Sequence, residues 1–241
     1  MEKPNKLISF SRASEVNTVG SKIIFEYEKN DWSSDTHLTS IFDLLKAKND
    51  VLTSSINRIK AESDLEAKDE VRDEKVRAIY YLILGYTHYP DLTIKTAAAK
   101  IEAIFGHYGL ELISKSYSVE SSLIESLLLE FTNPDVQSSI AALPGLSPLI
   151  TELSDAELAF KTASVAFDAE RGKEGTKESA TEVKQEVANV INEKIVVYLR
   201  AMIQVNEPTY GDLTRTIAQT IDDNNIAVKK RKQKPEPIVN N

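Results

Sequence analysis

The sequence predicts an all-α protein, an antiparallel helical bundle made of two tandem four-helix units. Apolar residues recur at spacings of three and four along most of the 241 residues, and no stretch alternates at every second residue. Only 8 Gly and 8 Pro interrupt the chain, which is too few for the frequent turns of an all-β fold. The hydrophobic fraction of 41% and the charged fraction of 27% are typical of a globular domain.

The first half contains four apolar stripes of helical spacing. Gly20 lies inside the first stripe and lowers its helix propensity. The charged stretch 64–69 is expected to separate the second helix from the third, which Pro90 ends. Asp91 is expected to cap the fourth helix, and Gly109 to end it as a left-handed C-cap would. The expected helices span residues 12–30, 36–63, 70–89 and 91–108.

The second half repeats these signals. Ser118 is expected to open a helix that ends at Phe131, and Asn133 and Pro134 a short one, with proline at its first position. The pair Ser147 and Pro148 gives the same start signal for a longer helix. The remaining expected segments are a stripe through 149–171, a loop at 172–176, a helix through 183–202 and a last helix that Asp212 caps.

An internal duplication is predicted because similar residues recur in the same order in both halves. The sequence offset between matched residues increases only across the expected loops. The matched segments are Ile23–Tyr27 with Leu127–Phe131, Ala61–Glu62 with Ala169–Glu170, Val71–Glu74 with Val183–Glu186, Tyr86 with Tyr198, and Asp91–Thr93 with Asp212–Thr214. The predicted organisation is an N-terminal segment 1–11, a first unit 12–108, a connector 109–117, a second unit 118–228 and a basic polar tail 229–241.

The chain also resembles a bacterial, all-helical family of unknown function, family 6261. The resemblance covers most of the chain and implies a helical fold, without any activity or site. It rests on diffuse packing and turn residues, namely Phe105-Gly106-His107-Tyr108-Gly109, Ser116-Tyr117, Glu120, Leu143, Leu153, Ala156, Phe160 and Arg171.

Charge and composition narrow the possible partners and compartments. The net charge of −8 and the pI near 5.1 oppose general attraction to nucleic acid. The absence of cysteine excludes disulfides, thiolate metal sites and a cysteine nucleophile. No signal-peptide core and no apolar run long enough to span a bilayer are present. We therefore expect a cytoplasmic protein without a membrane span.

Candidate sites are weak, and no catalytic, cofactor-binding or metal-binding residue is predicted. The three histidines are too scattered for a metal site read by spacing. Four glutamates at matching positions could converge as in di-metal bundles, but the Glu-x-x-His pairs of such bundles are missing, and salt bridges to Arg72 and Lys184 are expected instead. The histidines are His37, His88 and His107, and the glutamates are Glu62, Glu74, Glu170 and Glu186.

Two further features leave alternatives open. An aromatic cluster in the first half could line a ligand pocket, although such clusters usually form core; it comprises Tyr80, Tyr81, Tyr86, Tyr89, Phe105 and Tyr108. The basic run Lys229–Lys234 could contact phosphates or an acidic partner. The function expected is that of a non-enzymatic interaction or scaffold protein that binds a protein partner or its own copy, without cofactor. The alternatives are a small-ligand or metal-binding bundle, and a nucleic-acid accessory protein that acts through the basic tail.

Overall fold

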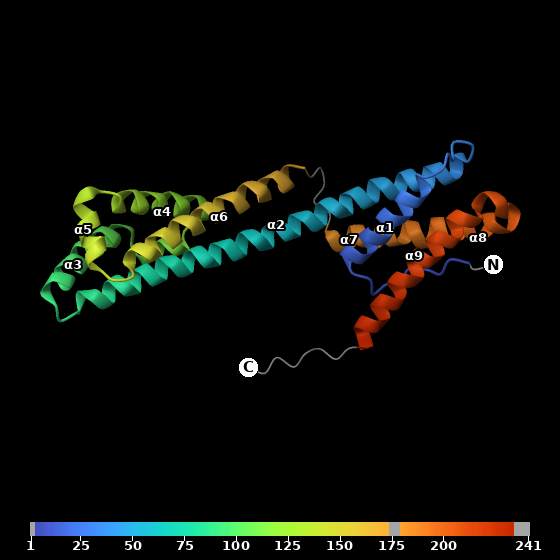
Figure 1. Ribbon diagram of the computed structural model, residues 1–241. Helices are drawn as coiled ribbons and strands as arrows, with labels where there is room; N and C mark the ends of the chain where they lie inside the picture. The colour runs from blue at the N-terminus through green and yellow to red at the C-terminus, as the bar shows by residue number, and fades with distance from the viewer. Residues whose placement is uncertain (1–2, 174–178, 234–241) are drawn as a thin grey trace. The chain divides into compact units, whose positions relative to one another are not determined.

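The computed structural model describes residues 3–173 and 179–233, and within these residues it contains helices and no strand. This confirms the predicted all-α class (Figure 1). The helices are α1 (Ala13–Tyr27), α2 (Thr36–Thr87), α3 (Leu92–Tyr108), α4 (Tyr117–Phe131), α5 (Pro134–Ala142), α6 (Leu146–Gly172), α7 (Ala180–Asn189), α8 (Val196–Val205) and α9 (Glu207–Gln233), together with a 3-10 helix η1 (Leu110–Ser114) and a π-helix η2 (Val190–Ile195).

Several local signals have the predicted effect. The Asp91 carboxylate accepts hydrogen bonds from two backbone N–H groups in the first turn of α3, and the Asn133 side chain accepts one at the start of α5. Gly109 ends α3 with a φ of +68°, a region that side chains with a Cβ rarely adopt. These signals are short-range, so the neighbouring sequence is sufficient to specify them.

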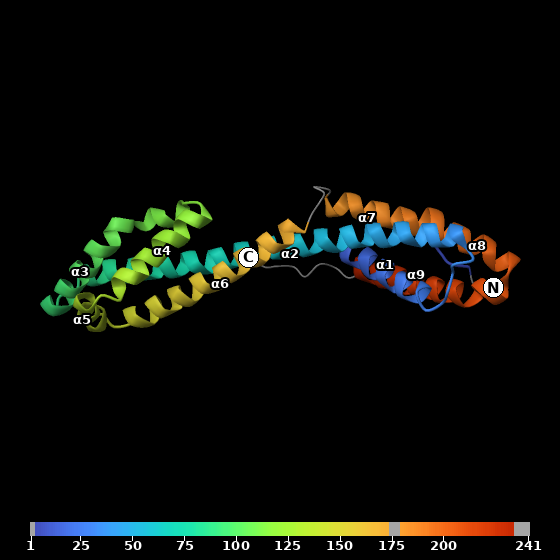
Figure 2. The ribbon, with the colours of Figure 1, turned by 90° about the horizontal axis from the view of Figure 1, so that it is seen from above.

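Other predicted boundaries are wrong. The second and third expected helices form one continuous helix, α2, because residues 64–69 are charged but contain no glycine or proline to break it (Figure 2). α4 follows Ser116, so Ser118 lies inside it, and α6 begins at Leu146. Asp212 lies in the interior of α9, which Asn206 caps through the Thr209 N–H. The expected loop 172–176 falls largely outside the described residues.

Contacts divide the chain into two compact units whose boundaries differ from the predicted ones. Unit 1 is formed by residues 1–59 and 172–241, and unit 2 by residues 60–171. The core of unit 1 therefore joins α1 and the first part of α2 to α7, η2, α8 and α9. The core of unit 2 joins the rest of α2 to α3, α4, α5 and α6. The predicted connector 109–117 lies inside unit 2, where it contributes the buried Leu112.

The two units bury residues at matching spacings. α1 corresponds to α4, and the first part of α2 corresponds to α6. The buried pairs of α1 and α4 are Val16/Glu120, Gly20/Ile124, Ile23/Leu127 and Tyr27/Phe131. Those of α2 and α6 are Leu38/Leu146, Leu45/Leu153, Asn49/Glu157, Leu52/Phe160 and Ser55/Ala163.

The later helices match in the same way. Buried residues of the second part of α2 correspond to those of α7 and η2, as Arg72/Val183, Val76/Val187, Ile79/Ile191 and Ile83/Ile195. The two members of each of the last two pairs are separated in the sequence by one residue more than those of the first two pairs. The wider turn of the π-helix accommodates that extra residue. α3 matches α9 through Ala97/Ile217, Ala98/Ala218 and Ile101/Ile221, which is one residue away from the predicted alignment of Asp91 with Asp212.

A pair of tyrosine hydrogen bonds follows the same correspondence. The Tyr86 hydroxyl donates to the Pro144 carbonyl, just before α6, at 2.9 Å. The Tyr198 hydroxyl donates to the Asp35 carboxylate, just before α2, at 2.8 Å. Each unit thus combines the first helices of one predicted half with the last helices of the other. The internal duplication itself stays a prediction, which these spacings support.

The chain ends take part in unit 1. The Asn192 side chain bonds both the N–H and the carbonyl of Leu7, and Leu7 is buried. The predicted tail is helical as far as the structure describes it, because α9 continues to Gln233. Val228 is fully buried, and Arg231 forms an ion pair with Glu15. The remaining tail residues lie outside the described part of the chain.

Candidate functional site

Unit 2 contains a fully buried arginine at the centre of an acidic group. Arg72 lies on α2, and its side chain has no exposed surface. Its guanidinium carbon is 3.7 Å from the centre of the Phe160 ring on α6, a cation–π contact. An arginine in this position needs several hydrogen-bond partners, because a buried charge without them is costly.

The partners come from α2, α4 and α6. Arg72 Nη2 lies 2.6 Å from an oxygen of Asp69 and 3.1 Å from Oε2 of Glu120. Arg72 Nη1 lies 3.0 Å from Oε2 of Glu157 and 2.9 Å from the hydroxyl of Ser121. Glu120 and Glu157 are themselves buried, with side chains 2% and 4% exposed. The arginine therefore fixes three carboxylates through one oxygen each.

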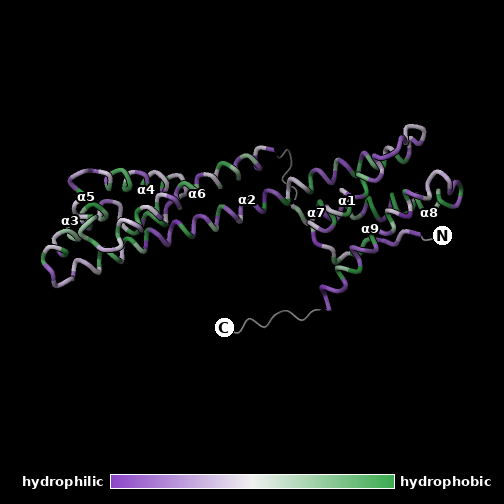
Figure 3. Tube along the Cα trace, viewed as in Figure 1, coloured by the Kyte–Doolittle hydropathy of each residue, from purple (hydrophilic) through white to green (hydrophobic). Residues whose placement is uncertain are grey.

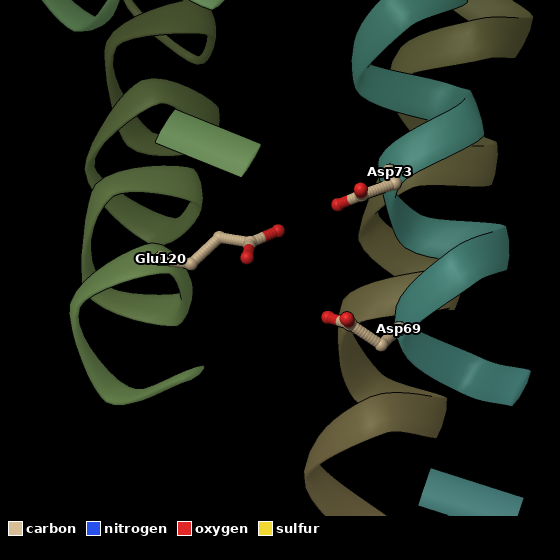
Figure 4. Close-up of side chains that lie close together, drawn as sticks. All are labelled: Asp69, Asp73 and Glu120. Atoms are coloured by element: carbon tan, nitrogen blue, oxygen red, sulfur yellow. The ribbon is translucent and has the colours of Figure 1, made fainter. Parts of the chain in front are cut away.

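Two of these carboxylates, together with Asp73, form the candidate site. Asp69, Asp73 and Glu120, here called the acidic trio, each offer one carboxylate oxygen, and the three oxygens lie within 4.8 Å of one another. Figure 4 shows the Glu120 side chain pointing from α4 toward the two aspartates on α2. Glu120 Oε1 and Asp73 Oδ1 are buried without a hydrogen-bond partner among the described residues. Two such oxygens need a proton or a cation to satisfy them.

The electrostatics of the trio follow from burial. Burial raises the pKa of Glu120 to about 8, against the opposing charge of Arg72. A hydrogen bond that the protonated Glu120 carboxyl group can form with Asp73, and the charge of Asp73, raise this pKa further. Burial also raises the pKa of Asp69, and Arg72 opposes this shift. The Asp73 carboxylate has its own surface partner, Arg77, at 2.8 Å. A group with excess negative charge in a buried position favours the uptake of positive charge.

The glutamates that the sequence singled out do not form this site. Glu186 lies in unit 1 and pairs with Lys48 at 2.6 Å, whereas Glu62 and Glu74 are exposed in unit 2. The expected pairing of Arg72 with Glu74 is wrong, because residues two apart on a helix point to different sides. Within the described residues, the group of possible metal ligands contains no histidine and no member of the predicted quartet.

The histidines and the aromatic residues are dispersed. The His37 ring is 5.0 Å from that of Tyr198 in unit 1, and His107 lies in the last turn of α3. Tyr80 packs against Phe105, with ring centres 5.7 Å apart, while Tyr86 contacts Tyr89. Tyr80 also contacts Tyr81, so the predicted aromatic cluster is divided into one group around Tyr80 and a separate pair of Tyr86 and Tyr89.

A sequence signal for the site existed but was missed. Arg72 precedes the buried Val76 and Ile79 at helical spacing, so it lies on the apolar stripe of α2. Glu120 lies on the stripe of α4 and Glu157 on that of α6. Charged residues in phase with an apolar stripe predict buried ion pairs.

Comparisons with known proteins agree with the fold and leave the activity open. A family model described as "Family of unknown function (DUF6261)" matches residues 62–222, which include the whole acidic trio. No curated protein and no solved structure matches the chain. Hydrophobic residues recur at intervals along the helices (Figure 3), and none of the described helices is long and apolar enough to cross a bilayer.

Proposed function

We propose that the chain, which belongs to the family of unknown function DUF6261, binds a hard divalent cation such as Ca²⁺ or Mg²⁺ through the acidic trio of unit 2. The observation that carries the proposal is the buried Oε1 of Glu120, which points into the trio and has no hydrogen-bond partner among the described residues. This takes up the metal-binding alternative of the sequence analysis with a different set of residues, and departs from the expectation of no metal.

The ligand chemistry fits a hard cation. Carboxylate oxygens bind Ca²⁺ at about 2.3–2.6 Å, so oxygens on opposite sides of one ion lie up to about 5 Å apart. The trio oxygens meet this limit. Waters would complete the coordination shell, as they do around Mg²⁺. A soft or imidazole-preferring metal is disfavoured by a set of three carboxylates.

Unit 1 provides the argument that the fold does not require these charges. The positions that correspond to Glu120 and Arg72 are Val16 and Val183, both buried. Matching helices therefore pack around an apolar centre in one unit and around an ionic centre in the other. Because buried ion pairs often contribute less to stability than packed apolar residues do, the charges of unit 2 support a role other than folding.

Arg72 has a positioning role in this proposal. It binds Asp69 and Glu120 from one side, which orients their other oxygens. It also cancels one of the trio's charges, so we expect weak binding, with a Kd of about 10⁻⁵ to 10⁻³ M. At a cation concentration of about 100 times Kd, binding would stabilise unit 2 by about 2.7 kcal/mol. A stabilising ion of this kind suits a non-enzymatic interaction or scaffold protein, which remains the broader function that we propose.

The test is a titration of the full chain after exhaustive dialysis against a chelator. Ca²⁺, Mg²⁺ and Mn²⁺ are titrated separately by calorimetry, and thermal unfolding is followed in parallel. We expect one ion per chain and a higher melting temperature. Asp73→Asn and Glu120→Gln should each weaken binding at least about tenfold, because each removes one charged ligand.

Glu152→Gln is the charge-matched control. Glu152 is half-exposed and pairs with Lys75 on the surface of unit 2, so its loss should leave the affinity unchanged. Circular dichroism of each variant reports whether it folds. Absence of binding in the wild-type chain, or equal affinities for wild type and the folded Asp73→Asn variant, would mean that a proton shared between Glu120 and Asp73 satisfies the site instead.

A further inference from the structure

A hollow in unit 2 lies between α2, the end of α3 and the start of η1. Its volume is about 260 Å³. The motif that ends α3 forms part of its wall, since Phe105, Gly106 and Gly109 all line it. None of the residues of the acidic trio does so. The hollow is therefore a separate feature from the proposed cation site.

The walls are aromatic and aliphatic. Tyr80 from α2 and Phe105 from α3 present two rings at 38° to each other, and Leu84 and Leu110 add aliphatic surface. Aromatic rings in the lining are suited to a cationic group, because the face of an aromatic ring carries partial negative charge.

A single carboxylate lies at the edge of the hollow. Glu102 belongs to α3 and is exposed, and it forms no ion pair or hydrogen bond within the described part of the chain. One carboxylate with no second acidic residue beside it in the hollow is insufficient for a metal ion, which needs several ligands. It matches one positive group on an organic molecule.

Gly106 keeps the hollow open. A Cβ added to this glycine would meet no atom within 4 Å, so packing does not demand a glycine here. Glycine in a helix interior is also less favourable than alanine. Because Gly106 has no side chain, it leaves room for a ligand in the hollow.

We propose that this hollow binds a small organic cation, with an ammonium group at Glu102 and an apolar body against Tyr80 and Phe105. The volume of about 260 Å³ lies just below the range of about 300–1,000 Å³ for ligand pockets, which limits the ligand to a small molecule. An amine with one aromatic ring satisfies the walls and the carboxylate together. An anion would meet no positive group in the lining of the hollow.

The test compares benzylammonium with benzyl alcohol, which has the same ring but no charge. Both are titrated into the full chain by NMR, with a chelator present so that the result is independent of any bound metal ion. We expect benzylammonium to bind about tenfold more tightly than benzyl alcohol. Glu102→Gln should remove about five- to tenfold of that affinity, while leaving benzyl alcohol unaffected.

Gly106→Leu should fill the hollow and weaken the binding of both probes. Gly85→Leu is the matched control, because Gly85 also has open space around its Cα but does not line the hollow. It should leave both affinities unchanged. Equal binding of the charged and neutral probes, or undiminished benzylammonium binding in Glu102→Gln and Gly106→Leu, would overturn the proposal.

Discussion

Unit 1 and unit 2 bury residues at matching spacings along their helices, but they differ in the residues at the centre of each unit. Where unit 1 buries Val16 and Val183, unit 2 buries Glu120 and Arg72. Neighbouring positions differ accordingly, since the buried Asn49 of α2 in unit 1 matches the buried Glu157 on α6. If the two units are equivalent, as the internal duplication predicts, this helix arrangement can form around either kind of centre.

The difference extends to a glycine. In unit 1, a Cβ on Gly20 would lie 2.4 Å from Oδ1 of Asn49, so a larger residue there would force the buried Asn49 side chain to shift. In unit 2 the corresponding residue is Ile124, and it packs in the apolar core. The glycine that lowers the helix propensity of α1 is therefore the residue that contacts Asn49.

The largest expected loss of stability comes from replacing Arg72 alone. Arg72→Met should lower the free energy of unfolding by about 3–5 kcal/mol, because it leaves Glu120 and Glu157 buried without their cationic partner. Urea unfolding measures this change. Lys75→Met, which removes the partly exposed pair with Glu152, should cost no more than about 1 kcal/mol. Equal losses for the two variants would contradict the buried-network description.

Two matched core truncations test whether the units correspond position by position. Leu52 on α2 and Phe160 on α6 are both buried. Leu52→Ala and Phe160→Ala should each cost about 2–5 kcal/mol in unfolding free energy. If one of the two cost less than about 1 kcal/mol, the proposed equivalence of the helices would fail at that position.

The smallest expected effect comes from giving unit 2 an apolar centre like that of unit 1. The triple variant Arg72→Met, Glu120→Leu and Glu157→Met should regain most of the stability lost in Arg72→Met, to within about 2 kcal/mol of wild type. It should also lose any Ca²⁺ or Mg²⁺ binding. A triple variant as unstable as the single one would show that the ionic centre is required for folding.

The parts of the fold that could be predicted are those specified by neighbouring residues. The helical stripes, the Asp91 and Asn133 caps and the end of α3 at Gly109 all depend on contacts within a few residues. The continuity of α2 was missed, because a run of charges was read as a break although its residues favour helix.

The composition of the units and the site depended on long-range contacts. No local pattern shows that α1 packs with α9 in one unit, while α3 packs with α4 and α5 in the other. The same holds for the acidic trio, since Glu120 is distant in sequence from Asp69 and Asp73. The spacing of Arg72 from Val76 and Ile79 places it on the apolar stripe of α2, but its partners on α4 and α6 depend on long-range contacts that no local pattern predicts.

The π-helix between α7 and α8 affects how the chain can tolerate the insertion of a residue during evolution. An extra residue in an ordinary helix would rotate every later side chain by about 100°, since each residue of an α-helix turns by that amount. Here the π-helix at Val190–Ile195 has a wider turn that can hold one extra residue, and Ile191 and Ile195 lie in the core of unit 1 while Tyr198 donates a hydrogen bond to Asp35. The effect of inserting one residue is thereby confined to one turn, and the side chains of the following helix keep their orientation.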